Sequence, residues 1–380
     1  MKLNFKEKQL GSDFAPETLK RVKEYISRGT SFVLMSMPGV GASYFLKYLA
    51  TLQFAHFIHV DFYELPNLTQ HEFYKLLLFR LGEKPKNESD EQLFIKAKSL
   101  LYSLSKKYEQ SSSGNKKIVL IFNRFDQLAK EFDWNFLSNI QSLSTLAPGK
   151  IVLIFTSTKP LIELTPEALE GGNLTFYSKL LYFKPYTKSE LKKLLKIEPQ
   201  EPAEGADVEK LIELSGGHNQ LFRILLNSQK QQNPSLDQFV KTQMKGLIDY
   251  LDYGQKKQIQ KIALGKKVDE VDDYLLGVGM VKQSGEKYSL FTPLLSEYIK
   301  TTLPVKLPPK EAKIFKLLRN NLGKVVLKDE IFASVWPDSD LPTDWALDAL
   351  IYRLRKHPYI TSHGYIIESN KKVGYLLVQT

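Results

Sequence analysis

The chain has 380 residues, of which 43% are hydrophobic and 25% charged; its net charge is +11 and it contains no cysteine. This composition is typical of a soluble globular protein with about two to four domains, and it excludes disulfides, thiolate zinc sites and thiol nucleophiles. No run of about 18 apolar residues is present and the N-terminal segment is polar, so we expect a cytoplasmic protein without a membrane span or signal peptide. The positive charge favours a polyanionic partner such as nucleic acid, although a general preference for lysine would produce the same excess.

Short apolar runs alternate with helical patterns from the start of the chain to about residue 185. Five runs are predicted as buried strands: Ser31–Met35, Phe57–Phe62, Lys117–Phe122, Lys150–Phe155 and Leu180–Phe183. Helices are predicted between them, for example over Glu17–Ser27, Tyr44–Leu52 and Glu91–Lys107. Continuous apolar strands separated by helices are typical of a parallel sheet that is covered on both faces. We therefore predict a doubly wound α/β fold for this part, followed by mostly helical segments.

The segment after the first predicted strand has the spacing of a phosphate-binding loop. Ser36–Ser43 (SMPGVGAS) contains Gly39 and Gly41 and leads directly into an apolar helix. Backbone N–H groups at such a helix N-terminus can hold a phosphate. The complete pattern also requires a glycine at its first position and a lysine before the final Ser or Thr. Ser36 and Ala42 occupy those positions, so the context is present but the cation is absent; a strand-to-helix turn without a ligand is the alternative interpretation.

The third and fourth predicted strands end in further polar residues. Asn123-Arg124 stand where P-loop ATPases of the AAA+ and STAND groups carry two acidic residues, one for Mg²⁺ and one that orients the attacking water. Both acidic charges are therefore missing, and Asp126 corresponds only to an additional acidic residue of many STAND proteins. Thr156, at the end of the fourth strand, matches the polar residue that senses the γ-phosphate.

Two later segments complete the resemblance to AAA+ and STAND ATPases. Tyr182–Leu191 resembles the passage from the last strand to the helical lid. Ser215–Gln220 resembles the glycine-rich lid motif, with Asn219 where proline is usual. Arg223 follows one turn later, out of register with the sensor arginine of AAA+ proteins. Residues 13 to about 232 thus resemble an ATPase core with its lid.

The resemblance implies a nucleotide site that has lost its catalytic residues. ATP or ADP would be held by the loop and the sensor position, at Gly39, Val40, Gly41, Ala42, Ser43 and Thr156. We predict no catalytic residue and no metal site, and hence a pseudo-ATPase in which nucleotide binding can persist without hydrolysis. An active ATPase that uses displaced residues, such as Lys47, Glu131 or an arginine from a neighbouring subunit, is the alternative.

Residues 237 to about 300 are predicted to form a first winged helix. Helical patterns lead to Asp272–Tyr298, in which Ser284-Gly285 separates two alternating runs and signals a hairpin. A helix followed by such a hairpin resembles the winged helix that follows the lid in STAND and origin-recognition-type ATPases. In STAND proteins this unit usually packs on the core, so we predict a structural role for it.

The last segment contains four characteristic stretches: Leu307–Leu318, Gly323–Ile331, Leu347–Lys356 and Ser369–Leu376. Their order resembles the OmpR-type winged helix, the DNA-binding effector domain of many bacterial response regulators. The third stretch has leucine or isoleucine at positions i, i+3, i+4 and i+7, and such an apolar stripe must face the core; its members are Leu347, Leu350, Ile351 and Leu354. In the family this helix enters the major groove, and an arginine of the wing enters the minor groove.

The opposite face of that helix is predicted to meet DNA, together with the wing; the candidate contacts are Trp345, Tyr352, Arg353, Lys356, Lys371 and Lys372. Arg353 could bind a guanine bidentately or clamp a phosphate. Asp344 would repel DNA near the helix start, whereas Asp348 matches an acidic family position and is interpreted as structural. A solvated basic face is the alternative interpretation. Tyr359–Glu368 is predicted to form a separate hairpin before the wing, or else a partner surface.

Together these resemblances predict an α/β fold in which a P-loop parallel sheet with a helical lid is followed by two winged-helix (α+β) domains. The expected limits are 13–187 for the P-loop core, 188–232 for the lid, 233–303 for the first winged helix and 304–380 for the OmpR-type domain. The predicted function is sequence-specific binding of double-stranded DNA in transcription regulation, with the core as a sensor or scaffold that self-associates or binds a protein partner. An origin-recognition-like or mobile-element DNA adaptor is the alternative in which other proteins are loaded onto DNA.

Overall fold

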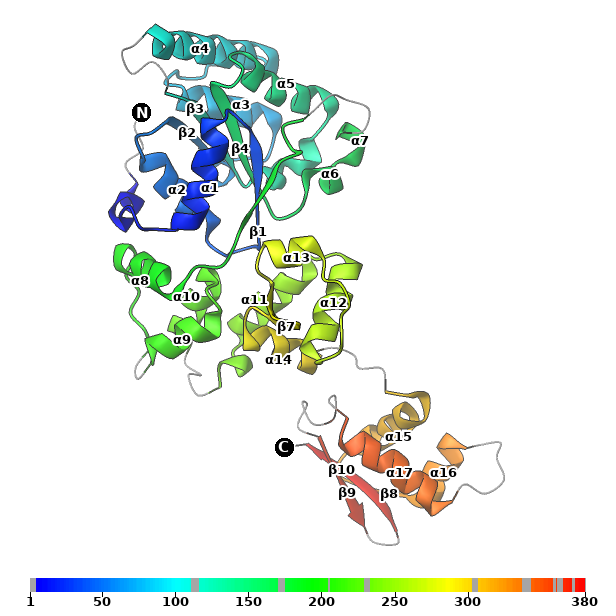
Figure 1. The fold of residues 1–380 in the computed structure, drawn as a ribbon. Helices are drawn as coiled ribbons and strands as arrows, with labels where there is room; N and C mark the ends of the chain where they lie inside the picture. Colours follow the sequence, from blue (N-terminus) through cyan, green and yellow to red (C-terminus); the bar gives the residue numbers. More distant parts are fainter. Residues whose placement is uncertain are drawn as a thin grey trace. The chain divides into compact units, whose positions relative to one another are not determined.

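The computed structural model describes residues 5–110, 116–169, 175–203, 206–228, 233–302, 307–336, 343–357, 360, 365–370 and 373–379 (Figure 1). These residues form two compact units. The first comprises the described residues up to 255 together with 270–292, and the second comprises 256–269 together with the described residues from 293 onward. The boundary passes through helix α12 (Tyr253–Ala263).

A five-stranded parallel sheet lies at the centre of the first unit (Figure 1). Its strands are β1 (Phe32–Ser36), β2 (His56–Asp61), β3 (Ile118–Asn123), β4 (Ile151–Ser157) and β5 (Leu180–Phe183). Their order is β2-β3-β4-β1-β5, and every residue of β1, β3 and β4 is buried. Strands buried on both faces explain the continuous apolar runs, because no residue alternates toward solvent. The predicted α/β fold with a parallel sheet is confirmed.

Helices cover both faces of this sheet. In chain order the helical elements of the core are η1 (Lys6–Leu10), α1 (Pro16–Ser27), α2 (Ala42–Thr51), η2 (Phe62–Glu64), α3 (Gln70–Arg80), α4 (Asp90–Gln110), η3 (Phe125–Glu131), α5 (Trp134–Thr145), α6 (Leu161–Leu164) and α7 (Pro166–Leu169). Phenylalanine side chains fill the space between sheet and helices; Phe125, for example, lies 4.7 Å from both Phe132 and Phe155, measured between ring centroids. This rigid core fixes the ends of the strands, where the candidate site lies.

Three helices, α8 (Lys188–Ile197), α9 (Val208–Ser215) and α10 (Asn219–Asn227), form the lid. Thr187 and Glu190 make a capping box at the start of α8, which explains the abrupt change from strand to helix. Helix α9 ends at Gly216, whose φ of +60° favours glycine. A Cβ there would lie 2.1 Å from the Phe291 carbonyl oxygen, so this glycine also permits close packing within the first unit.

The segment after the lid contributes two more helices, a short helix and a hairpin to the first unit: η4 (Pro234–Leu236), α11 (Gln238–Asp249), α13 (Asp273–Gly277), β6 (Val281–Ser284) and β7 (Lys287–Leu290). Strands β6 and β7 pair in antiparallel fashion, with Ser284 opposite Lys287. Gly285 in the turn between them has φ +59°, so the predicted hairpin at Ser284-Gly285 is confirmed.

The second unit contains a winged helix after α14 (Pro293–Thr302). Its elements are α15 (Pro309–Asn320), β8 (Val325–Leu327), α16 (Lys328–Val335), α17 (Asp344–Arg355), β9 (Tyr365–Asn370) and β10 (Gly374–Gln379). The three strands form an antiparallel sheet in the order β8-β10-β9. The predicted apolar stripe of α17 is at most 4% exposed and packs in the core of this unit with Ile314 and Leu318.

One expected element of the winged helix is wrong. The residues Tyr365–Glu368 do not belong to a separate hairpin before the wing, because they are part of β9, the first strand of the β9–β10 hairpin itself. The other residues of Tyr359–Glu368 lie outside the described residues, apart from the buried Ile360.

Candidate nucleotide and DNA-binding sites

The loop between β1 and α2 has the backbone of a phosphate-binding turn. Gly39 and Gly41 have φ values of +73° and +109°, which favour glycine. A Cβ on Gly39 would lie 1.9 Å from the Gln220 side chain, and a Cβ on Gly41 would lie 2.6 Å from the Tyr186 ring. Each glycine is therefore favoured for two reasons: its backbone has a positive φ, and a side chain, of Gln220 or Tyr186, occupies the space that a Cβ would need.

The lid is bound to the outward-facing carbonyl groups of this loop. The N–H groups of Asn219 and Gln220 donate to the carbonyls of Val40 and Gly39, at 3.3 and 3.1 Å. His218 lies with Nε2 2.8 Å from the Pro38 carbonyl oxygen, and the Tyr186 hydroxyl donates to the Gly41 carbonyl at 2.8 Å. Four consecutive carbonyl groups of the loop are thus held by the lid and its entry strand, which fixes the loop without a ligand.

Most N–H groups of the loop, unlike its carbonyl groups, make no hydrogen bond within the described chain. Among the described residues, the N–H groups of Gly39, Gly41, Ala42 and Ser43 have no hydrogen-bond partner in the chain. They lie at the N-terminus of α2, where the helix dipole favours an anion. The six predicted nucleotide-binding residues, from Gly39 to Ser43 together with Thr156, all line one cavity of about 870 Å³.

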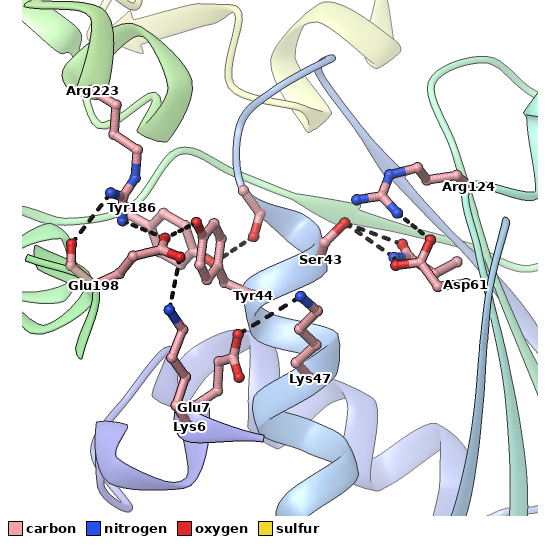
Figure 2. Close-up of polar contacts among 12 residues, drawn as sticks. Lys6, Glu7, Ser43, Tyr44, Lys47, Asp61, Arg124, Tyr186, Glu198 and Arg223 are labelled. Carbon is pink, nitrogen blue, oxygen red and sulfur yellow. Dashed lines mark hydrogen bonds and ion pairs between the residues drawn. The ribbon is translucent and has the colours of Figure 1, made fainter. Parts of the chain in front are cut away.

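A polar network joins the strand ends beside the loop (Figure 2). The Asn123 amide donates to Ser43 Oγ at 3.1 Å and to Asp61 Oδ2 at 2.9 Å. Thr156 donates through its hydroxyl to Asn123 Oδ1 at 3.1 Å, and the Arg124 N–H donates to Thr156 Oγ1 at 2.6 Å. The residues expected at the two acidic positions, Asn123 and Arg124, therefore connect the loop to β4 and to β2.

Arg124 is held in an uncommon backbone conformation, with φ +63°. Its guanidinium forms an ion pair with Asp61 and lies 3.7 Å from the centroid of the Tyr63 ring. The cation–π contact and the ion pair hold the Arg124 side chain in place, with 23% of its surface exposed. Arg124 and Tyr63 both line the cavity. Asp61 and Tyr63 were missed by the sequence reasoning, although Asp61 ends β2 as Asn123 ends β3.

A second ionic cluster lies on the lid side of α2 (Figure 2). Glu198 accepts hydrogen bonds from Lys6 at 2.8 Å and from the Tyr44 hydroxyl, and it pairs with Arg223 at 2.9 Å. Burial opposes ionisation of Glu198, but Lys6, Tyr44 and Arg223 outweigh burial and lower its pKa. Burial first, and then the hydrogen bond to Glu198, raise the pKa of Tyr44 to about 12. Arg223 lines the cavity, yet its guanidinium is bound by Glu198.

The displaced residues considered for catalysis do not reach the cavity. Lys47 Nζ lies 4.0 Å from Glu7, and neither Lys47 nor Glu131 is among the residues that line the cavity. Asp126 does line it, but Asp126 Oδ2 accepts hydrogen bonds from the N–H and the hydroxyl of Thr158, at 2.8 and 2.7 Å. Asp126 therefore fixes the chain after β4.

Helix α13 packs on the same edge of the sheet. The Tyr274 hydroxyl donates to the Thr158 carbonyl at 2.6 Å, two residues beyond the sensor position Thr156. A Cβ on Gly277 would lie 2.6 Å from the Tyr182 ring, so α13 approaches β5 closely. Tyr274 is 8% exposed and Leu275 is fully buried. The helix that precedes the hairpin is therefore packed against the core of the first unit.

Helix α17 presents the predicted DNA-binding face. Trp345 is 79% exposed, Tyr352 is 57% exposed, and the Arg353 side chain is 64% exposed. Lys356 is exposed too, with Nζ 4.3 Å from the Tyr352 ring centroid. The structure thus brings Trp345, Tyr352, Arg353 and Lys356 to the face opposite the buried stripe. The two predicted wing contacts, Lys371 and Lys372, lie outside the described residues.

Buried and half-buried partners orient this face. Arg353 Nε lies 3.2 Å from Oε1 of Glu311, a carboxylate of α15 that is only 6% exposed. The Tyr375 hydroxyl of β10 donates to Asp348, which gives Asp348 the structural role expected for it. Arg355 donates to the Ile367 carbonyl and the Ser369 hydroxyl of β9, at 2.8 and 2.6 Å. Sequence reasoning missed Glu311, because its partner is 42 positions away and on another helix.

Asp344 at the start of α17 is neutralised locally. Lys328 Nζ lies 3.0 Å from Asp344 Oδ2, and the Asp344 side chain is 66% exposed. The expected repulsion of DNA by this carboxylate is reduced by the neighbouring lysine, although an exposed pair of this kind contributes little to stability.

Comparison with known families bears on the C-terminal unit. Residues 302–377 match the family model described as "Transcriptional regulatory protein, C terminal". The C-terminus therefore carries an OmpR-type winged-helix domain, as predicted from the sequence. No curated protein sequence matches the chain.

Several solved structures are similar in fold to larger parts of the chain. A Walker-type ATPase of Pyrococcus abyssi matches with a TM-score of 0.46 and 16% identity, covering 75% of this chain and 95% of that one. The ORC1 protein of Aeropyrum pernix, solved in complex with DNA, matches with a TM-score of 0.41 and 11% identity over 99% and 94% of the two chains. The RuvB Holliday junction branch migration motor of Thermotoga maritima gives a TM-score of 0.37 and 15% identity over 79% and 100%.

Within the described ranges, no group of three or more His, Asp or Glu side chains is placed to hold a metal ion. None of the helices in the described part of the chain combines the length and the apolar character needed to cross a membrane.

Proposed function

We propose that this chain is a transcriptional regulator that binds double-stranded DNA with sequence preference through its C-terminal winged helix. The carrying observation is the family match over 302–377, combined with a helix whose polar and aromatic side chains are exposed opposite a fully buried stripe. Side chains on such a helix can reach base edges in the major groove, because the groove is wide enough to admit an α-helix.

Within this proposal, Arg353 and the neighbouring Trp345, Tyr352 and Lys356 contact the major groove and its phosphates. Arg353 is the candidate for base recognition, because its guanidinium is both exposed and oriented by Glu311. Lys371 and Lys372 are proposed to contact the minor groove or its phosphates from the wing. The positive net charge of +11 supports association with a polyanion such as DNA.

The P-loop unit is proposed to be a sensor or scaffold in the cytoplasm, and not a motor. It would bind ATP or ADP weakly at the loop from Gly39 to Ser43 and at Thr156, without hydrolysis. Support comes from the free N–H groups of the loop and from the loss of every acidic group at the hydrolytic positions, Asn123 and Arg124. Self-association or a protein partner would use this unit too.

Selection of bound fragments from a random pool of double-stranded DNA tests the DNA-binding proposal directly. We expect a short enriched motif from the full chain, and loss of that motif from the variant Arg353→Ala. Enrichment by DNA shape alone, with no preferred bases, would instead support the adaptor alternative. No enrichment at moderate salt would contradict DNA binding as the function.

Steady-state ATP turnover tests the absence of hydrolysis. We expect a rate equal to that of a protein-free control, because Asn123 and Arg124 stand at the two acidic positions and Asp126 Oδ2 is engaged by Thr158. A rate above background that disappears in Ser43→Ala would overturn the pseudo-ATPase proposal.

A further inference from the structure

The position that holds Mg²⁺ in P-loop ATPases has a different chemistry in this chain. Mg²⁺ requires near-octahedral oxygen ligands at about 2.0–2.1 Å, usually a hydroxyl, carboxylates, phosphate oxygens and water. Ser43 Oγ, the hydroxyl of the pattern, instead accepts a hydrogen bond from the Asn123 amide at 3.1 Å. An amide N–H group directed at this oxygen competes with a cation for the same lone pairs. These residues do not fit a magnesium ion.

The carboxylates near the loop are already engaged. Asp61 Oδ2 accepts from Asn123 at 2.9 Å, and Asp61 Oδ1 accepts from the Arg124 guanidinium and from the Tyr63 N–H. Asp126 Oδ2 accepts two hydrogen bonds from Thr158. To bind a metal, Asp61 would have to give up its ion pair with Arg124, in which the Asp61 side chain is only 8% exposed, and removing the partner of a buried carboxylate is strongly unfavourable.

The cavity is lined by a guanidinium, that of Arg124. Arg124 lines the cavity beside the loop, and one of its nitrogen atoms, Nη1, is used by Asp61. A guanidinium carries five N–H donors, and within the described chain no other side-chain hydrogen bond of Arg124 is made. The remaining donors match phosphate oxygens in geometry and in charge.

A separate observation points to a ligand in the cavity. Asn219 lines it and is only 5% exposed, yet Asn219 Oδ1 has no hydrogen-bond partner among the described residues. Leaving a buried amide oxygen without a partner is unfavourable, so a donor such as a hydroxyl or amino group of a ligand would be favourable there. Phosphates at the loop and a donor group beside Asn219 are features of a nucleoside polyphosphate.

We propose that this cavity binds a nucleoside di- or triphosphate without a divalent metal ion, with the Arg124 guanidinium and the free N–H groups of the loop as the anion ligands. The proposal rests on nucleotide binding by the core and is independent of DNA recognition. The lid–loop hydrogen bonds hold the loop in its binding geometry before the ligand arrives, so little conformational entropy opposes binding.

Isothermal titration of the full chain with ADP, ATP and inorganic pyrophosphate, each in EDTA and in excess Mg²⁺, tests this proposal. We expect Kd values in EDTA that equal those in Mg²⁺ within about twofold, or are lower, because Mg²⁺ neutralises the ligand without gaining a protein ligand. Binding of pyrophosphate as tight as ADP would show that the polyphosphate alone is recognised, and weaker binding would show that the nucleoside contributes. Binding at least about tenfold tighter in Mg²⁺, or no binding of any probe in either buffer, would overturn the proposal.

Variants separate the role of Arg124 from the stability of the network. Arg124→Gln is combined with Asp61→Asn, so that no buried carboxylate is left unpaired, and this pair is expected to weaken ADP binding at least about tenfold. Lys47→Ala, which removes a cation of α2 that does not line the cavity, serves as the control and should leave the affinity unchanged. Unchanged affinity in the double variant, with its fold verified by circular dichroism, would overturn the role of Arg124.

A restored metal site gives the converse experiment. Ala42→Lys with Asn123→Asp restores the lysine of the loop and the carboxylate of the metal position. Tighter binding of ADP in Mg²⁺ than in EDTA is expected from this variant alone. The same dependence in the unmodified chain would contradict the proposal. DNA binding is measured on the same preparations. Loss of DNA binding with intact ADP binding would contradict only the regulator proposal. Loss of ADP binding with intact DNA binding would contradict only the metal-free nucleotide site.

Discussion

The two candidate sites of this chain use their polar residues in opposite ways. Around the phosphate loop, side-chain charges are paired inside the protein: Asp61 binds Arg124, Glu198 binds Arg223, and Lys47 lies near Glu7. On α17, Trp345 and Tyr352 have most of their surface in solvent, and the Arg353 side chain is mostly exposed although its Nε is held. The core site offers backbone groups in a prearranged loop, whereas the helix offers side chains on a rigid frame.

This difference has a physical reason. A hydrolytic site needs unpaired charges that face a metal and a water molecule, and such charges are costly to bury. In this core Asn123 removes one carboxylate, and Arg124 satisfies Asp61. A DNA-reading surface has no such cost, because its charges stay hydrated until DNA arrives. The core is therefore stabilised by its network, while the winged helix depends on its apolar stripe.

The largest expected effect breaks the winged helix and leaves the core intact. Leu347 is completely buried in the stripe, so Leu347→Ala should lower the free energy of unfolding of this unit by about 2–5 kcal/mol and abolish DNA binding. Calorimetric unfolding of the full chain measures the shift, and ADP titration checks the core. Tyr352→Ala, a neighbouring exposed position, is the control that should leave unfolding unchanged. Equal unfolding curves for Leu347→Ala and the unmodified chain would refute this account of the stripe.

Acid should act on the core, where a neutral imidazole joins the lid to the loop. Burial lowers the pKa of His218 to about 4, against an ordinary value of 6.5. Between these two pH values the unfolded chain binds more protons than the folded chain. The contribution of His218 to the free energy of unfolding is therefore fully present above pH 6.5 and is lost as the pH falls toward 4. The loss from this group amounts to about 3 kcal/mol. His59, whose pKa burial lowers to about 4 as well, acts in the same direction.

Urea unfolding from pH 7 to pH 4.5 measures this effect. His218→Asn keeps an N-cap for α10, because asparagine is a favoured capping residue, but cannot take up a proton. We expect a flatter pH dependence for this variant than for the unmodified chain. If both lose the same stability over this range, proton uptake at His218 is not responsible.

The sequence was informative wherever a local pattern determines the structure. The five strands were predicted within about two residues at each end, because continuous apolar runs between helices have few other solutions. The carboxyl ends of parallel strands meet at one edge of the sheet. Thr156 and Asn123 therefore lie beside the loop, as the order of the motifs implied. The stripe of α17 followed from helical periodicity alone.

Contacts between distant segments could not be derived in the same way. The partnership of Asp61 with Arg124 depends on which strands are neighbours, and strand order is not encoded in either residue. Two of the hydrogen bonds between lid and loop come from the backbone N–H groups of Asn219 and Gln220, which leave no trace in side-chain identity. Tyr365–Glu368 was assigned to the wrong hairpin, since alternating residues on both sides of a loop fit more than one strand pairing.

A smaller effect concerns base recognition by α17. Arg353→Ala removes the exposed guanidinium and should weaken binding to the selected DNA motif by about 1–3 kcal/mol, with less discrimination at one base position. The variant also leaves the buried Glu311 without its partner, so it is compared with the double variant Arg353→Ala/Glu311→Gln. Fluorescence anisotropy at several salt concentrations gives affinity and salt slope. If both stay unchanged in both variants, Arg353 does not contact DNA.

The smallest effect tests whether Glu311 positions Arg353 for reading bases. Glu311→Gln keeps the shape of the side chain but removes the charge that holds Arg353 Nε at 3.2 Å. We expect the ratio of specific to non-specific affinity to fall by about tenfold, while non-specific affinity rises because one negative charge is gone. Asp344→Asn removes a comparable charge from the exposed pair with Lys328, and should raise non-specific affinity without changing that ratio. Equal ratios in the two variants would mean that Glu311 acts only through charge or stability, and that the orientation of Arg353 does not depend on it.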